Sequence, residues 1–336
     1  MSFPKPFAVK VALVQQEQNN MKAKTKLIIG ALTGVAAVFA TSKALDKLVH
    51  EHLHRDGIAV IKHKLMTKKN REDFANNPEV NLGKLFHVST PQTEVSILNR
   101  EGRNINALLF KQENESKKYV IIVHGYRASV KSVSYLSKRY FEAGYNVLLP
   151  YLRAHLGSDY EYSTMGWHER FDIVDWINYI NRNELGAKIV LHGVSMGAAT
   201  VMMTTGEKLP QNVVCAIEDC GYTSVYDAYT YKIPKMMKIP AFPFINVFRR
   251  AIKKRVGFDI KEASALEQVK KSKTPILFIH GNEDSVVPVE MAKTLYKNAN
   301  CEKEILIIKG ANHEMSALLC PDLYWKTVWN FIEKHK

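Results

Sequence analysis

The residues best suited to chemistry form the pentapeptide Gly193-Val194-Ser195-Met196-Gly197. An apolar run at residues 188–192 precedes it, and a run of small and apolar residues at 198–203 follows it. This order predicts a strand, a tight turn and a helix. A serine in such a turn has a strained backbone, and small residues must flank it where the strand and the helix approach closely. We therefore expect the Ser195 hydroxyl to stand clear of the sheet as a nucleophile.

A serine nucleophile needs a base to take its proton and a carboxylate to orient that base. His313 follows the last expected strand, and Asp284 follows the strand before it. We expect these two side chains to complete a triad with Ser195. Glu283, which adjoins Asp284, and Asp219, which ends an earlier strand, remain alternatives for the acid.

Short apolar runs alternate with helical stretches from about residue 84 onward. Strands alternating with helices imply right-handed crossovers and a mostly parallel central sheet flanked by helices, with chemistry at the carboxyl ends of its strands. The residues expected there include His124, Gly125 and Tyr126. The expected strands are 85–88, 94–98, 105–110, 119–123, 146–150, 188–192, 213–219, 275–279 and 304–308, and the expected helices include 132–143 and 167–182.

Residues 85–336 resemble the α/β-hydrolase superfamily, and they are most similar to bacterial, membrane-associated serine hydrolases of the esterase or acyl-transfer kind. The order of Ser195, Asp284 and His313 along the chain is the one these enzymes use. The motifs that carry the resemblance are His124-Gly125-Tyr126, Gly193-Val194-Ser195-Met196-Gly197, Asp219-Cys220-Gly221-Tyr222-Thr223-Ser224, His280-Gly281-Asn282-Glu283-Asp284-Ser285-Val286-Val287-Pro288 and Gly310-Ala311-Asn312-His313.

The resemblance implies an oxyanion hole made by the backbone N–H groups of Tyr126 and Met196, with His124 and Gly125 at the substrate. The loop at residues 150–158 is similar to the family's Asp-x-Arg-x-His-Gly-x-Ser loop. It departs from that loop because Tyr151 replaces the aspartate and Leu156 replaces a glycine.

The activity that the resemblance implies is hydrolysis of carboxylic esters or thioesters through an acyl-enzyme intermediate, on a small-molecule or lipid-like ester. A serine peptidase or aminopeptidase of the same fold differs only in the leaving group. A non-catalytic envelope-binding protein that keeps the fold is an alternative of another class. We expect no cofactor and no metal.

An insertion between residues 219 and 275 is expected to form a small helical lid at about 225–266. Its methionine and aromatic side chains would line an adaptable apolar cleft for an acyl chain, with Tyr222, Met236 and Met237 against the substrate. Alternatively, they form a small core of the lid itself. The basic run at 249–255 would rest on anionic headgroups or be solvated.

The N-terminal region resembles a secretory or anchoring segment, because lysines precede a small and apolar run at residues 27–40. Extended to residue 44, the run is just long enough to span a bilayer. We expect a retained anchor at 27–44, a basic extension at 1–26, a charged helical connector at 45–83 and an extracytoplasmic hydrolase domain at 84–336. Cleavage near Ala40, which gives a secreted protein, and a buried soluble helix are the alternatives.

The formal net charge of +14 suits contact with anionic lipid or cell-envelope polymers. The lysines are spread along the chain and no nucleic-acid-binding motif is found, so we expect no nucleic-acid partner. The four cysteines lack Cys-x-x-Cys spacing, which indicates small buried hydrophobic residues rather than a zinc site or a disulfide framework.

The segment His50-Glu51-His52-Leu53-His54 has the His-Glu-x-x-His spacing of zinc proteases. On a helix this spacing places His50 and His54 on one face, with Glu51 as a general base. Few apolar neighbours could bury a dry metal cleft, and no third ligand stands out downstream. We therefore expect a solvated helix face, with adventitious binding of a divalent metal as the alternative.

Overall fold

The computed structural model describes residues 43–60, 68–238 and 240–336. The chain divides into two compact units, 1–48 and 49–336, and the fold described below is that of the second. Apart from its last two residues, the expected anchor at 27–44 lies outside the described residues. Within the described part of the chain, we find no helix long and apolar enough to cross a membrane.

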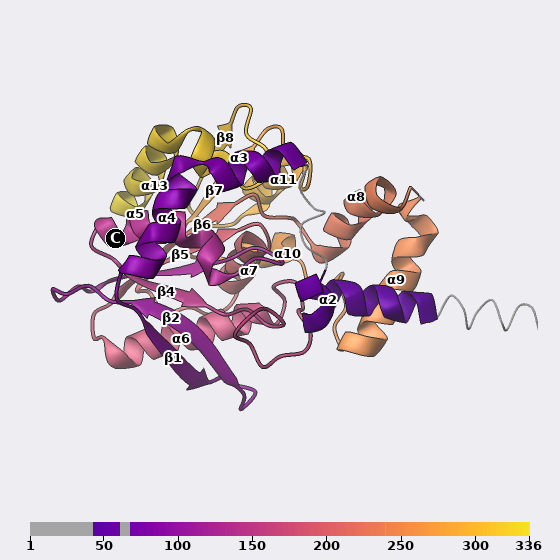
Figure 1. The fold of residues 1–336 in the computed structure, drawn as a ribbon, viewed down its shortest axis with the longest axis horizontal. Helices are drawn as coiled ribbons and strands as arrows, with labels where there is room; N and C mark the ends of the chain where they lie inside the picture. Colours follow the sequence, from indigo (N-terminus) through magenta and orange to yellow (C-terminus); the bar gives the residue numbers. More distant parts are fainter. Residues whose placement is uncertain (1–42, 61–67, 239) are drawn as a thin grey trace, which may run out of the picture. The chain divides into compact units, whose positions relative to one another are not determined.

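The centre of the second unit is an eight-stranded sheet in the order β1-β2-β4-β3-β5-β6-β7-β8 (Figure 1). Strands β3 to β8 run parallel, whereas β2 is antiparallel to both β1 and β4. The predicted, mostly parallel sheet is therefore confirmed, and β1 and β2 form an antiparallel hairpin at its edge. The strands are β1 (Thr93–Leu98), β2 (Asn104–Phe110), β3 (Lys118–Val123), β4 (Asn146–Pro150), β5 (Lys188–Val194), β6 (Val213–Asp219), β7 (Ile276–Gly281) and β8 (Lys303–Ile308).

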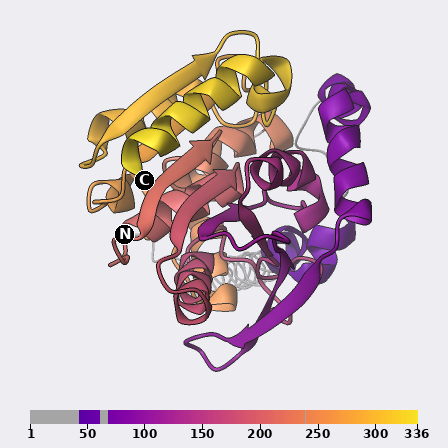
Figure 2. The ribbon, with the colours of Figure 1, turned by 90° about the vertical axis from the view of Figure 1, so that its left-hand side faces the viewer.

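Helices cover both faces of this sheet, as Figures 1 and 2 show from two directions. One face packs on α4 (Pro78–Ser89), α5 (Ser134–Glu142) and α13 (Pro321–His335), which share a hydrophobic core with it. The other face carries α6 (Glu169–Asn183), α7 (Met196–Thr205), α10 (Ala265–Val269) and α11 (Val289–Asn298). Because the central strands are buried on both faces, their sequences are continuous apolar runs rather than alternating ones. The remaining named helices are α2 (Arg55–Val60), α3 (Lys68–Asn76), the 3-10 helix η1 (Val130–Val133), α8 (Val225–Met237), α9 (Ala241–Val256) and α12 (Ser316–Leu319).

The predicted strand at residues 85–88 is wrong, because these residues belong to α4. The Asn77 side chain caps this helix by accepting a hydrogen bond from the Glu79 N–H at 2.9 Å, and Pro78 occupies the first turn. The buried residues of α4 recur three or four positions apart, which is the spacing of one helical face. The expected domain boundary at residue 84 consequently falls inside a helix.

The insertion between β6 and β7 contains α8 and α9, which project beside the sheet (Figure 1). Some of its aromatic residues pack on one another, since the Tyr229 and Phe248 rings meet edge to face at 5.2 Å. In the basic run, Arg249 and Lys253 both pair with the buried carboxylate of Asp259. This part of the insertion therefore has a small core and ion pairs of its own.

Candidate active site

Ser195 lies in the turn between β5 and α7 with φ 57° and ψ −116°, a conformation that is strained for a residue with a side chain. The backbone of β5 and that of α7 lie so close together here that a Cβ atom on Gly193 would collide with the Gly197 carbonyl. A Cβ atom on Gly197 would collide with the Val123 carbonyl on β3. The two flanking glycines thus allow the turn to hold Ser195 at the carboxyl end of the sheet.

The structure brings Ser195, His313 and Asp284 into one hydrogen-bonded chain. The His313 Nε2 atom lies 2.8 Å from the Ser195 Oγ atom, and His313 Nδ1 lies 2.6 Å from Asp284 Oδ2. With Nδ1–H donating to the carboxylate, Nε2 is free to accept the serine proton. The three residues follow β5, β8 and β7, so the carboxyl ends of separate strands supply them.

The Asp284 carboxylate is held in its ionised form. Its Oδ1 atom accepts hydrogen bonds from the Val286 and Val287 N–H groups, each at 2.8 Å, and its Oδ2 atom lies 3.3 Å from His280 Nε2. Burial opposes the charge, but His313 and His280 outweigh it and keep the Asp284 pKa well below its usual range. Burial likewise disfavours the His313 imidazolium, yet Asp284 raises the His313 pKa above its ordinary value.

Among the described residues, neither alternative acid forms a hydrogen bond or ion pair with the His313 imidazole. Glu283 is exposed. Asp219 is buried at the end of β6, where burial raises its pKa to about 6, and its backbone carbonyl accepts a hydrogen bond from the Ser195 N–H at 2.8 Å. The geometry therefore selects Asp284 as the carboxylate that orients His313.

The backbone N–H groups of Tyr126 and Met196 have no hydrogen-bond acceptor among the described residues. Gly125 lets the chain approach Ser195, because a Cβ atom there would lie 3.4 Å from the Ser195 Cβ atom and 2.8 Å from Glu314 Oε1. These two N–H groups are therefore available to an oxygen atom of a ligand.

His155 supports the turn that contains Tyr126, and sequence reasoning did not identify this role. The His155 Nε2 atom accepts a hydrogen bond from the Arg127 backbone N–H at 3.0 Å, while its Nδ1–H donates to the Arg153 carbonyl at 2.9 Å. Arg153 is itself fixed by a buried ion pair with Asp172 at 2.6 Å. The loop at 150–158 thus orders the turn, although two of its residues differ from the family pattern. The similarity of this loop to the family pattern was the sequence feature that could have indicated the role of His155.

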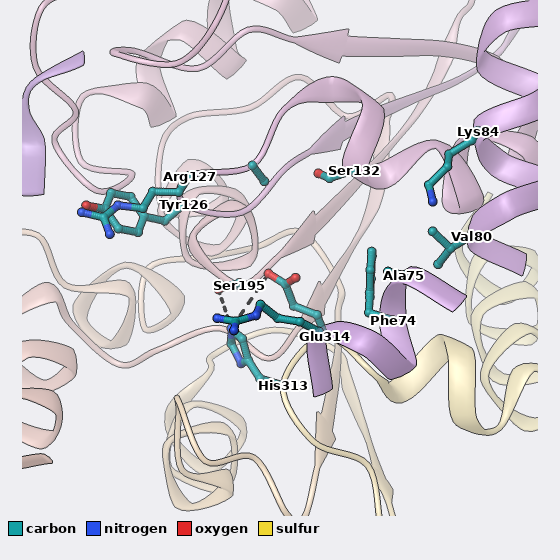
Figure 3. A pocket seen from close by; sticks show the side chains of 12 residues that line it. Phe74, Ala75, Val80, Lys84, Tyr126, Arg127, Ser132, Ser195, His313 and Glu314 are labelled. Carbon is teal, nitrogen blue, oxygen red and sulfur yellow. Dashed lines mark hydrogen bonds and ion pairs between the residues drawn. The ribbon is translucent and has the colours of Figure 1, made fainter. Parts of the chain in front are cut away.

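A cavity of about 380 Å³ opens beside Ser195 and His313. Glu314, another residue that sequence reasoning missed, lines it with its Oε1 atom 3.9 Å from His313 Nε2, and burial raises its pKa. Part of the wall comes from α3 and α4, which precede the sheet in sequence. Figure 3 shows Ser195, His313 and Glu314 together, with residues of these two helices nearby, among them Phe74, Ala75, Val80 and Lys84.

A second cavity, of about 50 Å³, also contacts Ser195 and is lined by the lid helix α8. Tyr222 lines it, and its hydroxyl donates to the Met165 carbonyl at 2.8 Å. Met236 and Met237 end α8, but their side chains lie outside the described part of the chain.

His124 and Gly125 line neither of these two cavities. The His124 ring is buried behind the turn, where its Nδ1 atom lies 2.9 Å from the Gly125 carbonyl, and burial lowers its pKa to about 3. His124 is thus a buried residue next to the turn, outside the walls of these two cavities.

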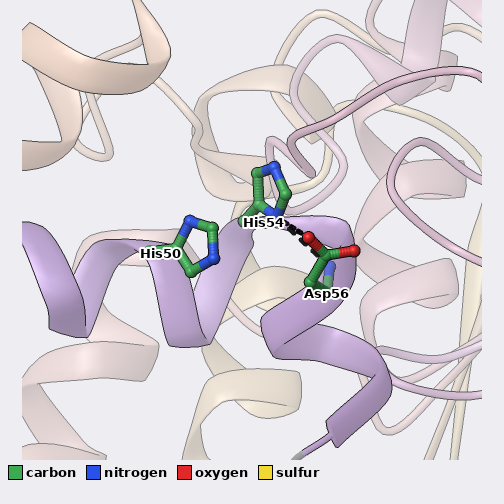
Figure 4. Close-up of side chains that lie close together, drawn as sticks. All are labelled: His50, His54 and Asp56. Atoms are coloured by element: carbon green, nitrogen blue, oxygen red, sulfur yellow. Dashed lines mark hydrogen bonds and ion pairs between the residues drawn. The ribbon is translucent and has the colours of Figure 1, made fainter.

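Of the His-Glu-x-x-His segment, His52 alone lines one of these two cavities, and the Glu51 and His52 carbonyls accept hydrogen bonds from the Arg127 guanidinium and the Tyr126 hydroxyl. The His50 and His54 rings stack at 4.1 Å, and Asp56 Oδ2 lies 3.5 Å from His54 Nδ1 (Figure 4). His50, His54 and Asp56 each offer one ligand atom, all within 4.8 Å of one another. Asp56, rather than Glu51, is thus the carboxylate that accompanies the two histidines.

The sheet, the turn at Ser195 and the hydrogen-bonded chain define a serine hydrolase of the α/β-hydrolase fold. The chain belongs to the prolyl oligopeptidase family, whose model matches residues 132–335. Over 215 residues it is 27% identical to the uncharacterized protein YqkD of Bacillus subtilis, covering 64% of this chain and 70% of that protein.

Two solved structures with the same fold illustrate the range of enzymes that share it. The esterase Pf2001 of Pyrococcus furiosus superposes with a TM-score of 0.60 at 21% identity, over 74% of this chain and 92% of that chain. The acylaminoacyl peptidase of Pyrococcus horikoshii superposes with a TM-score of 0.55 at 19% identity, over 75% of this chain and 43% of that chain.

Proposed function

We propose that the protein hydrolyses carboxylic esters or thioesters through an acyl-enzyme intermediate. The observation that carries this proposal is the hydrogen-bonded chain from Ser195 through His313 to Asp284, which lies at the edge of a cavity large enough for a small molecule. Ser195 is the nucleophile, His313 the general base and Asp284 the group that orients the imidazole and stabilises its charge.

In the first half of the reaction, His313 Nε2 takes the hydroxyl proton as Ser195 Oγ attacks the carbonyl carbon. The N–H groups of Tyr126 and Met196 bind the resulting oxyanion, and the loss of one such donor costs on the order of 3 kcal/mol in comparable enzymes. His313 then returns the proton to the leaving oxygen or sulfur, which breaks the ester bond. In the second half, His313 activates water, which releases the acid and restores Ser195.

The walls of the large cavity favour an apolar substituent on the substrate. Phe74, Ala75 and Val80 present carbon surface there, and the volume of about 380 Å³ falls in the range of small-molecule sites. These features support a lipid-like ester, with the apolar chain beside α3 and α4.

A serine peptidase is the second candidate, and the match to the prolyl oligopeptidase family favours it. A peptidase would use the same residues and differ in the nitrogen leaving group. Measuring kcat/KM for an aryl ester and for an aminoacyl amide of the same acid separates the two. A rate on the amide equal to that on the ester would replace the ester proposal.

The test of the proposed function is labelling with a fluorophosphonate, which reacts with activated serine. We expect one adduct, on Ser195, and none in a Ser195→Ala variant that has the same circular dichroism spectrum. Ester hydrolysis should disappear in the same variant. A folded wild-type protein that takes no label and cleaves no ester would overturn the proposal and favour the non-catalytic binding protein.

We also propose that residues 27–44 attach the chain to a membrane, with the hydrolase outside the cytoplasm. The lysines that precede an apolar run support this proposal. Fractionation of cells expressing the full chain tests it: recovery with the membranes, and release by detergent rather than by salt, is expected. Recovery of a shortened chain from the medium would instead support cleavage near Ala40.

A further inference from the structure

Lys232 on the lid helix α8 lines the small cavity beside Ser195. Among the described residues, it has no ion pair and no hydrogen bond, although much of its side chain is shielded from solvent. Burial, together with the positive charge of Arg127, lowers the Lys232 pKa to about 8. Most molecules therefore carry a positive charge at this position at neutral pH.

A shielded ammonium group without a counter-ion is costly, and an anion placed beside it would offset that cost. The described lining of the small cavity contains no aspartate or glutamate that could serve as the anion. The Tyr222 hydroxyl, another polar group of the wall, already donates to Met165. The site therefore presents an unneutralised cation to whatever enters it.

The size of the small cavity limits what can enter. Its volume is about 50 Å³, against about 380 Å³ for the large cavity, so it suits a group of few non-hydrogen atoms. A carboxylate on one carbon atom fits this space, whereas a long acyl chain does not.

The two cavities meet at the same reacting group. Ser195 and Tyr126 line both of them, whereas Phe74 and Val80, together with the charged Arg71 and Lys84, line the large one alone and Lys232 lines the small one alone. A carbonyl group at Ser195 would consequently adjoin a large cavity with a mainly apolar wall and a small cavity whose one charged side chain is that of Lys232.

We infer that the small cavity is a subsite for a short carboxylate of the substrate, bound by Lys232. The inference rests on the proposed ester hydrolysis and narrows its substrate class. The preferred esters then carry an apolar chain on one side of the scissile bond and a short carboxylate on the other. Lys232 is in this view a specificity-determining residue and takes no part in bond making.

The test compares two esters of equal size at pH 7, the octanoyl ester of glycolic acid and the octanoyl ester of glycolamide. The first carries a carboxylate where the second carries a neutral amide. Replacing Lys232 by methionine keeps an apolar chain of similar length without the charge. We expect Lys232→Met to lower kcat/KM for the glycolate ester by about tenfold to a hundredfold, the usual effect of losing a charged hydrogen bond.

The glycolamide ester should be cleaved by the Lys232→Met variant within about twofold of the wild-type rate, which also shows that the variant is folded. Lys235→Met is the matched control, because Lys235 is an exposed lysine of the same helix and lines neither cavity. Equal losses on both esters would overturn the carboxylate subsite and leave the proposed function standing. No turnover of either ester by wild-type protein, with no fluorophosphonate adduct on Ser195, would contradict both.

Discussion

The His155 imidazole accepts a hydrogen bond from the backbone N–H of Arg127 at 3.0 Å. Arg127 has a positive φ of 60° and directly follows Tyr126, one of the two proposed oxyanion donors. The bond therefore connects the loop after β4 to the backbone that would stabilise the transition state. His155 contacts no reacting atom, so we regard it as a positioning residue.

Replacing His155 by alanine should lower kcat by about tenfold to a hundredfold with little change in KM, because a misplaced donor affects the transition state more than substrate binding. His155→Gln should recover part of the rate, since its amide oxygen can accept the Arg127 N–H. Steady-state kinetics on an aryl ester measures both effects. A rise in KM with unchanged kcat, or no rescue by glutamine, would argue against the positioning role.

Asp284→Asn should lower kcat by about four orders of magnitude, which is the effect of removing the carboxylate from a serine triad. The matched variant is Asp219→Asn, which alters another buried carboxylate, at the end of β6. It should change kcat by less than about tenfold, because His313 Nδ1 pairs with Asp284. Reversed magnitudes in the two variants would assign the acid to Asp219.

The activity should depend on pH through His313, which must be neutral to accept the serine proton. Asp284 raises the His313 pKa, so kcat/KM should increase with pH and reach half its maximum above the ordinary histidine value of about 6.5. Because Asp284→Asn removes the negative charge that stabilises the imidazolium, its remaining activity should have this midpoint at lower pH. A profile of kcat/KM from pH 5 to 9 measures both midpoints, and an unchanged midpoint in the variant would contradict the assignment.

Glu218 should make the protein less stable as the pH rises. Its side chain is fully buried, and burial raises its pKa to about 8, against 4.5 for an ordinary glutamate. Between these values the folded state keeps a proton that the unfolded state has lost, so the stability from this group is present below pH 4.5 and is lost as the pH rises to about 8. Glu218→Gln, which is always neutral, should therefore lose less Tm than the wild type between pH 5 and 8.

The difference in Tm between Glu218→Gln and the wild type should therefore change in favour of the variant from pH 5 to pH 8, because only the wild type carries a carboxyl group that the unfolded state ionises in this range. Calorimetry at the two pH values measures it, with the exposed Glu267→Gln as the control. Parallel Tm curves for wild type and Glu218→Gln would show that Glu218 does not titrate in this range.

Removal of metal ions should leave ester hydrolysis unchanged. His50, His54 and Asp56 converge on one another, but none of them lines either cavity next to Ser195. Assays before and after dialysis against a chelator check this expectation. A loss of activity that added zinc restores would revive the zinc-protease interpretation of the histidine segment.

Much of the sheet could be predicted from the sequence, because strands such as β3 and β6 are buried on both faces and are therefore continuous apolar runs. The Ser195 turn could also be predicted. A side chain at Gly193 or Gly197 would collide with neighbouring backbone atoms, so the turn requires glycine at both positions. The short apolar segment at 85–88 was misassigned because four residues do not distinguish a strand from one face of a helix. The cap at Asn77 was the stronger local signal.

The remaining features depend on contacts between distant segments, which spacing does not encode. Nothing in the sequence near Phe74 indicates that α3 would line a cavity at Ser195, because that contact is set by how α4 packs on α5. The role of His155 likewise depends on its hydrogen bond with the Arg127 N–H. The position of a backbone group cannot be predicted from the identity of the side chain that the residue carries.

The contribution of α3 and α4 to the large cavity determines where the protein can be truncated at its N-terminus without changing that cavity. A truncation that starts at residue 84, where sequence motifs suggest that the enzyme begins, would remove Phe74, Ala75 and Val80 and cut α4 in two. Such a fragment retains the triad residues but lacks part of the wall of the large cavity. Substrate screens therefore need the full region from residue 49 onward to report the selectivity of the intact enzyme.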